Sequence, residues 1–325
     1  MNLYIDKENV FSLIRSMKKD PQKYEDCIRL MRRNLDVKFN FSPDGLSPVE
    51  RELFDMFFED LNYAGTDKSF LETAFPQRPL KANCYNQFSM EHLRSVYLLD
   101  DPKVGVVIDK GCLLIGGVGD ELEVLSRLFF DDYQYNERID IEQVGGNWNF
   151  LSKHALPTSD IILVDQYILC EVDMYKRNLY AILDRLTSGI HDYKVNIVIV
   201  ITRGNIDHYS PEKIQSDIEN QLLARIGVKP NVTIVELPRQ QREHDRTIVT
   251  NFMRYHSGDT FNYFNSRGGM ETRGRDFNIS SLASEDNRAL VNDLLEDLQY
   301  KINLRQQVEA DYFTGNGECN FLDIH

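Results

Sequence analysis

The chain has 325 residues, with 37 lysines and arginines against 51 aspartates and glutamates, so its formal net charge is −14. A hydrophobic content of 42% suffices for a folded core and excludes the disordered and collagen-like classes. No apolar run approaches the length of a membrane span, about 18 residues. The negative charge disfavours wholesale wrapping of nucleic acid or anionic lipid, so a phosphate-binding site must be a local cationic patch.

Apolar residues recur at helical spacing over 7–33, and a second helix is predicted over 47–63, where Ser47 is the N-cap and Glu50 completes a capping box. Region 1–100 is therefore predicted to be mainly helical. The turn-forming sequence Asp-Asp-Pro-Lys at 100–103 is the expected boundary to the next domain.

From 101 to 310, short β-branched runs alternate with helical patterns, which predicts an α/β domain. The expected strands are 104–108, 112–117, 161–169, 195–203, 232–237 and 246–252, and the expected helices are 119–130, 172–188, 211–226 and 284–308. Because the runs at 161–169 and 195–203 are apolar almost throughout, we expect strands buried on both faces of a sheet. The Gly-Asn-Gly of the tail, residues 311–325, predicts a loose end.

The chain shows few motifs of known catalytic chemistry. The glycine-rich turn within 113–128 lacks the Gly-Lys-Ser/Thr of a phosphate loop, which favours a plain strand-to-helix turn. The seven histidines never occur as HxH or HExxH, so we expect no metal site and no cofactor. The five cysteines are scattered along the chain, which indicates a reducing environment. The first residues show no signal-peptide pattern, so the sequence predicts a cytoplasmic protein.

An arginine-rich segment stands out between residues 239 and 275. It holds seven arginines, no lysine and four acids. Exclusive use of arginine suggests bidentate pairing with phosphate or carboxylate, although a strand face paired with the protein's own acids fits equally well. The interleaved aromatics could stack on single-stranded bases or form a strand-pair core: Phe252, Tyr255, Phe261, Tyr263 and Phe264.

Within this segment, His244 and Arg246 open a predicted strand, with Asn251 seven residues and Gly258 fourteen residues after the histidine. The spacing resembles the phospholipase D superfamily pattern His-x-Lys-x4-Asp-x6-Gly-Ser-x-Asn, with Arg246 and Asn251 in place of the Lys and the Asp. The positions of the Ser and the second Asn are also changed here. The His-Asp-Arg form is similar to a degenerate branch of that superfamily, which includes the C-terminal domain of microtubule-interacting-and-transport proteins and prokaryotic relatives.

The resemblance covers about 104–308 and implies a phospholipase-D-like mixed sheet flanked by helices. In catalytic members the histidine attacks a phosphodiester, and each site needs two motif-bearing halves. This chain carries one motif, so catalysis requires a homodimer. The resemblance and the arginines together nominate phosphate-binding and supporting residues. The phosphate-binding candidates are Arg246, Asn251, Arg254 and Gly258, and the supporting ones are Asp165 and Asp245.

Three functions stay open. The leading one is a non-hydrolytic or residual-activity module of a bacterial, defence-related system that recognises a phosphate-bearing ligand, nucleic acid included, or a protein partner. The second is a dimeric, metal-independent phosphodiesterase or nuclease with His244 as its nucleophile. The third is a structural protein in which the helices of 1–95 dock a partner and the His-Asp-Arg strand belongs to the core.

Overall fold

The computed structural model describes residues 1–16, 19–62, 71–72, 93–100, 113–131, 134–189, 193–206, 209–241, 246–265, 267–271, 276–309 and 311–324. The chain divides into two units. Unit 1 is Met1–Tyr135 with Ala283–Asp286, and unit 2 is Asn136–Leu282 with Asn287–His325. The division after Tyr135 differs from the boundary expected near residue 100, because a strand and a helix beyond residue 112 complete the first sheet.

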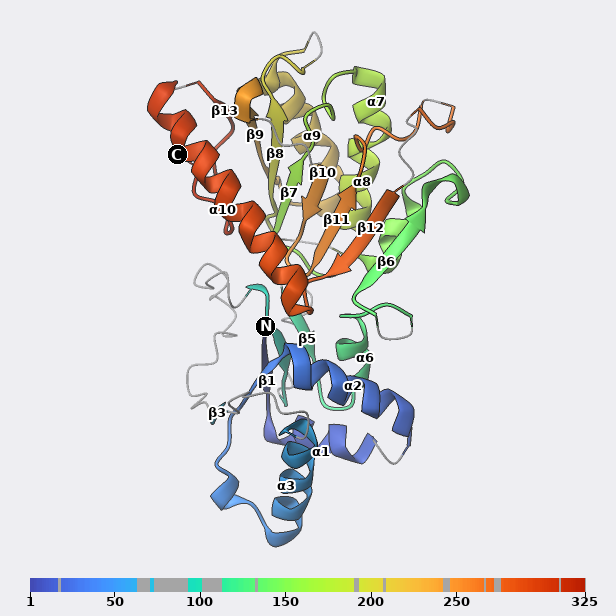
Figure 1. The fold of residues 1–325 in the computed structure, drawn as a ribbon, viewed down its shortest axis with the longest axis vertical. Helices are drawn as coiled ribbons and strands as arrows, with labels where there is room; N and C mark the ends of the chain where they lie inside the picture. Colours follow the sequence, from blue (N-terminus) through green and yellow to red (C-terminus); the bar gives the residue numbers. More distant parts are fainter. Residues whose placement is uncertain are drawn as a thin grey trace. The chain divides into compact units, whose positions relative to one another are not determined.

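Unit 1 is built on a parallel sheet with the strand order β3-β2-β1-β4-β5 (Figure 1). Its strands are β1 (Asn2–Ile5), β2 (Asp36–Phe39), β3 (Leu71–Glu72), β4 (Val96–Leu98) and β5 (Leu114–Gly116). Its helices are α1 (Lys7–Ser16), α2 (Pro21–Asn34), α3 (Pro48–Asn62) and α6 (Glu121–Ser126), with the short turn η1 (Pro43–Gly45). The structure thus adds a sheet to the region predicted as mainly helical. Strands this short carry too few residues to show a period of two.

The helix start predicted from the capping box of Ser47 and Glu50 is confirmed. The Ser47 amide donates to Oε2 of Glu50 at 2.9 Å, and the Glu50 amide donates to Oγ of Ser47 at 3.4 Å, which is the reciprocal pairing of a capping box. In unit 2, the Ser210 side chain accepts from the Lys213 amide in the same way, at the start of α9 (Pro211–Ile226).

Unit 2 is an eight-stranded mixed sheet with the order β13-β9-β8-β7-β10-β11-β12-β6 (Figure 1). Its strands are β6 (Asn136–Asp140), β7 (Asp160–Val164), β8 (Asn196–Thr202), β9 (Asn231–Leu237), β10 (Arg246–Val249), β11 (Met253–Ser257), β12 (Asp276–Ser281) and β13 (Phe313–Thr314). Strands β7, β8 and β9 are parallel, and the remaining pairs are antiparallel. The predicted α/β class, a mixed sheet flanked by helices, is confirmed.

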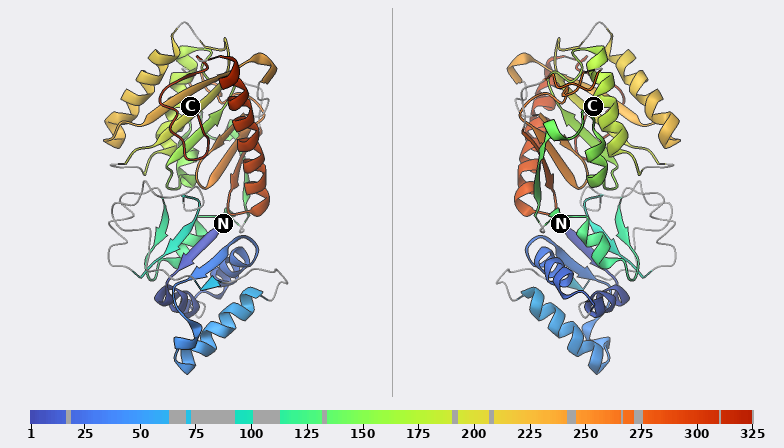
Figure 2. Two further views of the ribbon diagram at one scale, coloured as in Figure 1. Left: turned by 90° about the vertical axis from the view of Figure 1, so that its left-hand side faces the viewer. Right: turned by 90° about the vertical axis from the view of Figure 1, so that its right-hand side faces the viewer.

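The parallel strands are buried on both faces, as their apolar runs predict. The crossovers between them carry α7 (Val172–Arg177), α8 (Leu179–Leu186) and α9, whereas α10 (Glu285–Val308) lies on the opposite face of the sheet from α9 (Figure 2). The short turns η4 (Ile141–Gln143), η5 (Asn149–His154) and η6 (Arg239–Gln241) complete the unit. Among the described helices of the chain, none has the length and apolar character needed to cross a bilayer.

The aromatic side chains of the arginine-rich segment belong to the core of unit 2. All five are at most 1% exposed, and three of them, Phe261, Tyr263 and Phe264, lie next to the buried Trp148. The Trp148 Nε1 donates to Oδ1 of Asn178 at 3.0 Å, and the Asn178 Nδ2 donates to the Phe264 carbonyl at 2.8 Å. Of the two alternatives left open by the sequence, the structure therefore supports a core role rather than base stacking.

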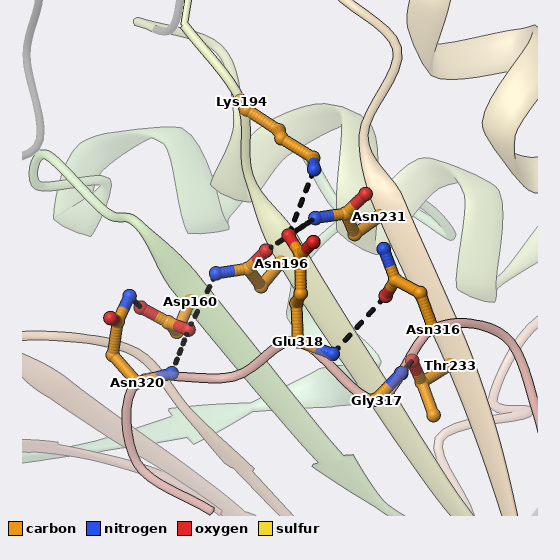
Figure 3. A network of polar contacts seen from close by, with 9 residues as sticks. All are labelled: Asp160, Lys194, Asn196, Asn231, Thr233, Asn316, Gly317, Glu318 and Asn320. Atoms are coloured by element: carbon orange, nitrogen blue, oxygen red, sulfur yellow. Dashed lines mark hydrogen bonds and ion pairs between the residues drawn. The ribbon is translucent and has the colours of Figure 1, made fainter. Parts of the chain in front are cut away.

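The C-terminal tail crosses the starting ends of the three parallel strands, as Figure 3 shows. The first residues of β7, β8 and β9 lie side by side in register, and the tail binds two of them. Asn320 donates through its backbone amide and its Nδ2 to the carboxylate of Asp160, each at 2.8 Å. Glu318 accepts from Lys194 at 2.8 Å and also from Asn231. The tail is thus a strap that joins the strands.

The prediction of a loose tail is wrong because its glycines serve close packing. Gly317 has φ +73°, and a Cβ built there would lie 2.3 Å from the Ile324 carbonyl oxygen. Gly315 has φ +125°, and its Cβ would lie 2.4 Å from the Val232 carbonyl oxygen of β9. Only glycine can hold this backbone so close to its neighbours.

We expect Gly317→Ala to lower the free energy of unfolding by about 2–4 kcal/mol, since it adds steric overlap to an unfavourable φ. Gly204→Ala is the matched control, because Gly204 has φ +83° and nothing within 4 Å of the new Cβ. Chemical denaturation of both variants separates overlap from backbone strain. Equal losses in the two variants would show that the tail does not need the close approach.

Candidate functional site

The carboxyl ends of the parallel strands meet at one edge of the unit 2 sheet, where open α/β sheets bind ligands. Asp165 follows β7, Arg203 follows β8, and Arg239 comes shortly after β9. Strand β10 runs antiparallel to β7 with Thr247 opposite Val164, so its first residue, Arg246, lies at the same edge beside Asp165. In the strand order β9-β8-β7-β10, this edge therefore carries Arg239, Arg203, Asp165 and Arg246. We call Arg203, Arg239 and Arg246 the arginine edge.

Asp165 is almost fully buried, at 1% exposure, and its carboxylate is held by three donors. Oδ1 accepts from the Tyr167 amide at 2.9 Å, while Oδ2 accepts from Oγ1 of Thr260 and from the Phe261 amide, both at 2.7 Å. Burial raises the pKa of Asp165 to about 6, although these donors and the charge of Arg246 oppose that rise. Asp165, which was predicted as a supporting residue, thus lies next to Arg246 on the neighbouring strand.

The loop after β11 is fastened to the loop after β7 by further contacts. Asn262 donates through Nδ2 to the Tyr167 carbonyl at 3.0 Å and to the Ile168 carbonyl at 3.2 Å. Together with the Asp165 contacts, they hold residues 258–265 over the end of β7. The loop is rigidly placed because its aromatic residues are anchored in the core at the same time.

Arg246 is half-buried, and its Nη1 donates to the carbonyl oxygen of Gly258 at 3.4 Å. Register explains this contact, because Arg246 pairs with Ser257 across β10 and β11 and Gly258 directly follows. Two of the predicted phosphate-binding residues, Arg246 and Gly258, are therefore brought together with Asp165. The predicted nucleophile His244 and the supporting Asp245 lie outside the described residues.

Asn251 lies at the other end of β10, away from Arg246. Five residues along an extended chain span about 17 Å. Its Oδ1 accepts from the Thr158 hydroxyl at 2.8 Å and from the Ser159 and Asp160 amides at 3.0 and 3.3 Å, and its Nδ2 donates to the Ser159 hydroxyl at 3.0 Å. The side chain is fully buried. In this position it organises the start of β7 and does not join the group around Arg246.

Arg254 occupies the opposite face of the sheet from Arg246. It pairs with Val249, whereas Arg246 pairs with Ser257, and side chains alternate along each strand. Its Nη2 lies 3.5 Å from Nδ1 of His256, which is also 3.5 Å from the Thr247 hydroxyl. The four predicted phosphate-binding residues therefore occupy three separate places in unit 2. The arginine edge contains one of them.

Arg203 was not singled out in the sequence because it lies outside the arginine-rich segment. A usable signal was present, since it is the last residue of the strand predicted over 195–203. It is exposed and pairs with Oε2 of Glu309 at 2.5 Å. Its place at the carboxyl edge, next to Arg239 on the neighbouring strand, extends the cationic group beyond Arg246.

In unit 1, strands β2 and β3 follow on one side of β1, whereas β4 and β5 lie on its other side. Open α/β sheets bind ligands at the point between two such strands, here β1 and β4. Buried polar groups lie there: Asp6, which follows β1, accepts from the Asp100 amide at 3.0 Å. Glu121 accepts from Asn9 at 3.0 Å and from the Gly119 amide at 3.0 Å. These carboxylates fasten helices and turns. Over the described residues of the chain, no group of three or more His, Cys, Asp or Glu side chains is arranged to hold a metal ion.

The arginine edge combines exposed guanidinium groups with one half-buried guanidinium beside a buried acid. Guanidinium groups bind phosphate through paired hydrogen bonds, so the chemistry available here is anion binding. No protein-family model matches the chain, and no curated protein matches its sequence. The phospholipase-D-like resemblance therefore stays a prediction that rests on the motif around Arg246.

Proposed function

We propose that this protein is a non-hydrolytic, phospholipase-D-like module that binds a phosphodiester chain, such as single-stranded nucleic acid, along the arginine edge. The observation that carries the proposal is the placement of Arg203, Arg239 and Arg246 at one edge of the sheet, where β8 and β9 end and β10 begins. Adjacent strands are about 4.8 Å apart, so the three cations form a row rather than a single pocket. A row suits a polyanion better than one isolated phosphate.

The distribution of charge also supports this proposal. The whole chain carries −14, so the arginine edge is a local exception in a repelling field. Such a site gains most of its affinity from direct pairing and from counterion release, and little from long-range attraction. Binding by this edge is therefore expected to weaken steeply as the salt concentration rises.

Arg246→Ala should weaken binding of fluorescently labelled oligothymidylate by about tenfold or more, because a hydrogen bond to a charged group contributes roughly 1.5–3 kcal/mol. Fluorescence anisotropy on the full chain at low salt measures this loss, and Arg203→Ala should act in the same direction. Arg29→Ala is the matched control. It removes the same charge from α2 of unit 1, where Arg29 pairs with Asp26 at 3.1 Å.

Equal weakening by Arg29→Ala and Arg246→Ala would indicate a general charge effect and count against the arginine edge. Cleavage of the oligonucleotide in the presence of EDTA, abolished by His244→Ala, would replace the proposal by the dimeric phosphodiesterase. If the wild-type chain bound no oligonucleotide at any salt concentration, the function would have to be sought in protein partners.

A further inference from the structure

We propose that Asp165 is an internal counter-ion that competes with an external phosphodiester for Arg246, so that protonation of this carboxyl strengthens binding at the arginine edge. This inference rests on the proposed function and adds its regulation by pH. Asp165 is the residue of β7 that falls between Arg203 on β8 and Arg246 on β10 in strand order. It therefore sits inside the cationic row rather than beside it.

The geometry makes Asp165 a fixed charge rather than a mobile one. Its three donors are groups of the two loops that it fastens, namely the Tyr167 and Phe261 amides and the Thr260 hydroxyl. The carboxylate cannot move from its place without breaking these bonds. In its ionised form it offsets part of the positive charge that an incoming phosphodiester would meet, because the charge of Arg246 acts on it from the neighbouring strand.

The structure also offers a place for the proton. Two of the three donors are backbone amides, which cannot accept a hydrogen bond, but the Thr260 hydroxyl can. A protonated Oδ2 can donate to Oγ1 of Thr260 while Oδ1 still accepts from the Tyr167 amide. Neutralisation therefore costs the loop few contacts and leaves the charge of Arg246 uncompensated by Asp165.

Other charged groups act near this position. The charge of Arg246 on β10 acts on Asp165. In the loop after β11, the charges of Asp259 and Asp165 both act on the Tyr263 hydroxyl. On β8, the Val200 carbonyl accepts a hydrogen bond from the Asp165 amide at 3.1 Å. Arg203 interacts electrostatically with two other acidic residues, Glu309 and Glu236. A hydrogen bond from Arg305 lowers the pKa of Glu309, and burial raises the pKa of Glu236.

The test is oligothymidylate binding by the full chain at about pH 5.5 and about pH 7.5, since neither thymine nor a phosphodiester titrates in this range while a carboxyl with a raised pKa does. We expect wild-type affinity to rise by about tenfold on acidification. Asp165→Asn should bind tightly at both pH values because it is permanently neutral. Asp184→Asn, which removes a carboxylate of α8 that pairs with Arg225, should behave as wild type.

Thr260→Val provides a second variant that does not alter the carboxyl itself. It removes a hydrogen bond to the ionised form, so the pH at which affinity changes should move upward. Two results would overturn the inference while leaving the proposed function intact: a pH response that persists in Asp165→Asn, or one that disappears in Glu236→Gln instead. Absence of binding by every variant at both pH values would instead contradict the proposed function itself.

Discussion

Deleting residues 311–325 should prevent unit 2 from folding stably. The tail buries four large side chains, Tyr312, Phe321, Leu322 and Ile324, each at most 8% exposed. Burial of such side chains contributes about 1.5–3 kcal/mol each, so their joint loss is on the order of 6–12 kcal/mol. That is comparable with the whole stability of an ordinary domain, about 5–15 kcal/mol. The deletion also removes the contacts of Glu318 and Asn320 with the strand ends.

Chemical denaturation followed by circular dichroism measures this effect, and size-exclusion chromatography adds a second signal. Without β13, strand β9 becomes an uncovered edge of apolar sequence, which favours pairing between chains. Val308→Ser is the control, since Val308 is 75% exposed at the end of α10 and should change stability by less than about 0.5 kcal/mol. A truncated monomer that unfolds at the wild-type denaturant concentration would contradict the role of the tail as a strap.

Asn251→Ala should lower the free energy of unfolding by about 3 kcal/mol or more, without a specific effect on oligothymidylate binding. The substitution leaves the Ser159 and Asp160 amides without their buried acceptor, and each such loss costs roughly 1–3 kcal/mol. Thermal unfolding measures the change, which corresponds to a fall in midpoint of about 10 °C for a unit of this size.

Asn251→Asp gives a sharper version of the same test, because it restores the residue of the phospholipase D pattern. It keeps the acceptor oxygen but loses the donation to the Ser159 hydroxyl and places a second carboxylate beside the buried Asp160. We therefore expect it to destabilise as well. Asn220→Ala on the exposed face of α9 is the control. Normal stability combined with lost oligothymidylate binding in the Asn251 variants would return this residue to the phosphate site.

The sequence was sufficient where structure follows from local pattern. Helices over 211–226 and 284–308 match α9 and α10 closely, because caps and apolar spacing are encoded in neighbouring residues. The apolar run at 161–169 was predicted as one strand, but β7 ends at Val164. At that point Asp165 turns the chain by accepting from the Tyr167 amide, a contact that hydrophobicity does not reveal.

Several strands of two to five residues escaped prediction. Strands β1, β2 and β11 have four or five residues each, and their periodicity is too short to distinguish from that of a loop or a helix end. The strand predicted over 104–108 lies outside the described residues. The strap formed by the tail was missed for a different reason. Its glycines suggest flexibility in isolation, and only the neighbouring backbone shows that they are needed for contact.

The sequence by itself determined the α/β class, the main helices of unit 2 and the concentration of arginines near β10. Sequence reasoning also named Asp165 as a supporting residue, and Asp165 lies beside Arg246 on the neighbouring strand. The tertiary structure decided which of the predicted residues lie close together. Register sets Arg246 beside Gly258 and sends Arg254 to the other face, and the rise of the strand carries Asn251 to the far end. The arginine edge was hidden because its members come from three strands, and only the order of strands in the sheet makes them neighbours.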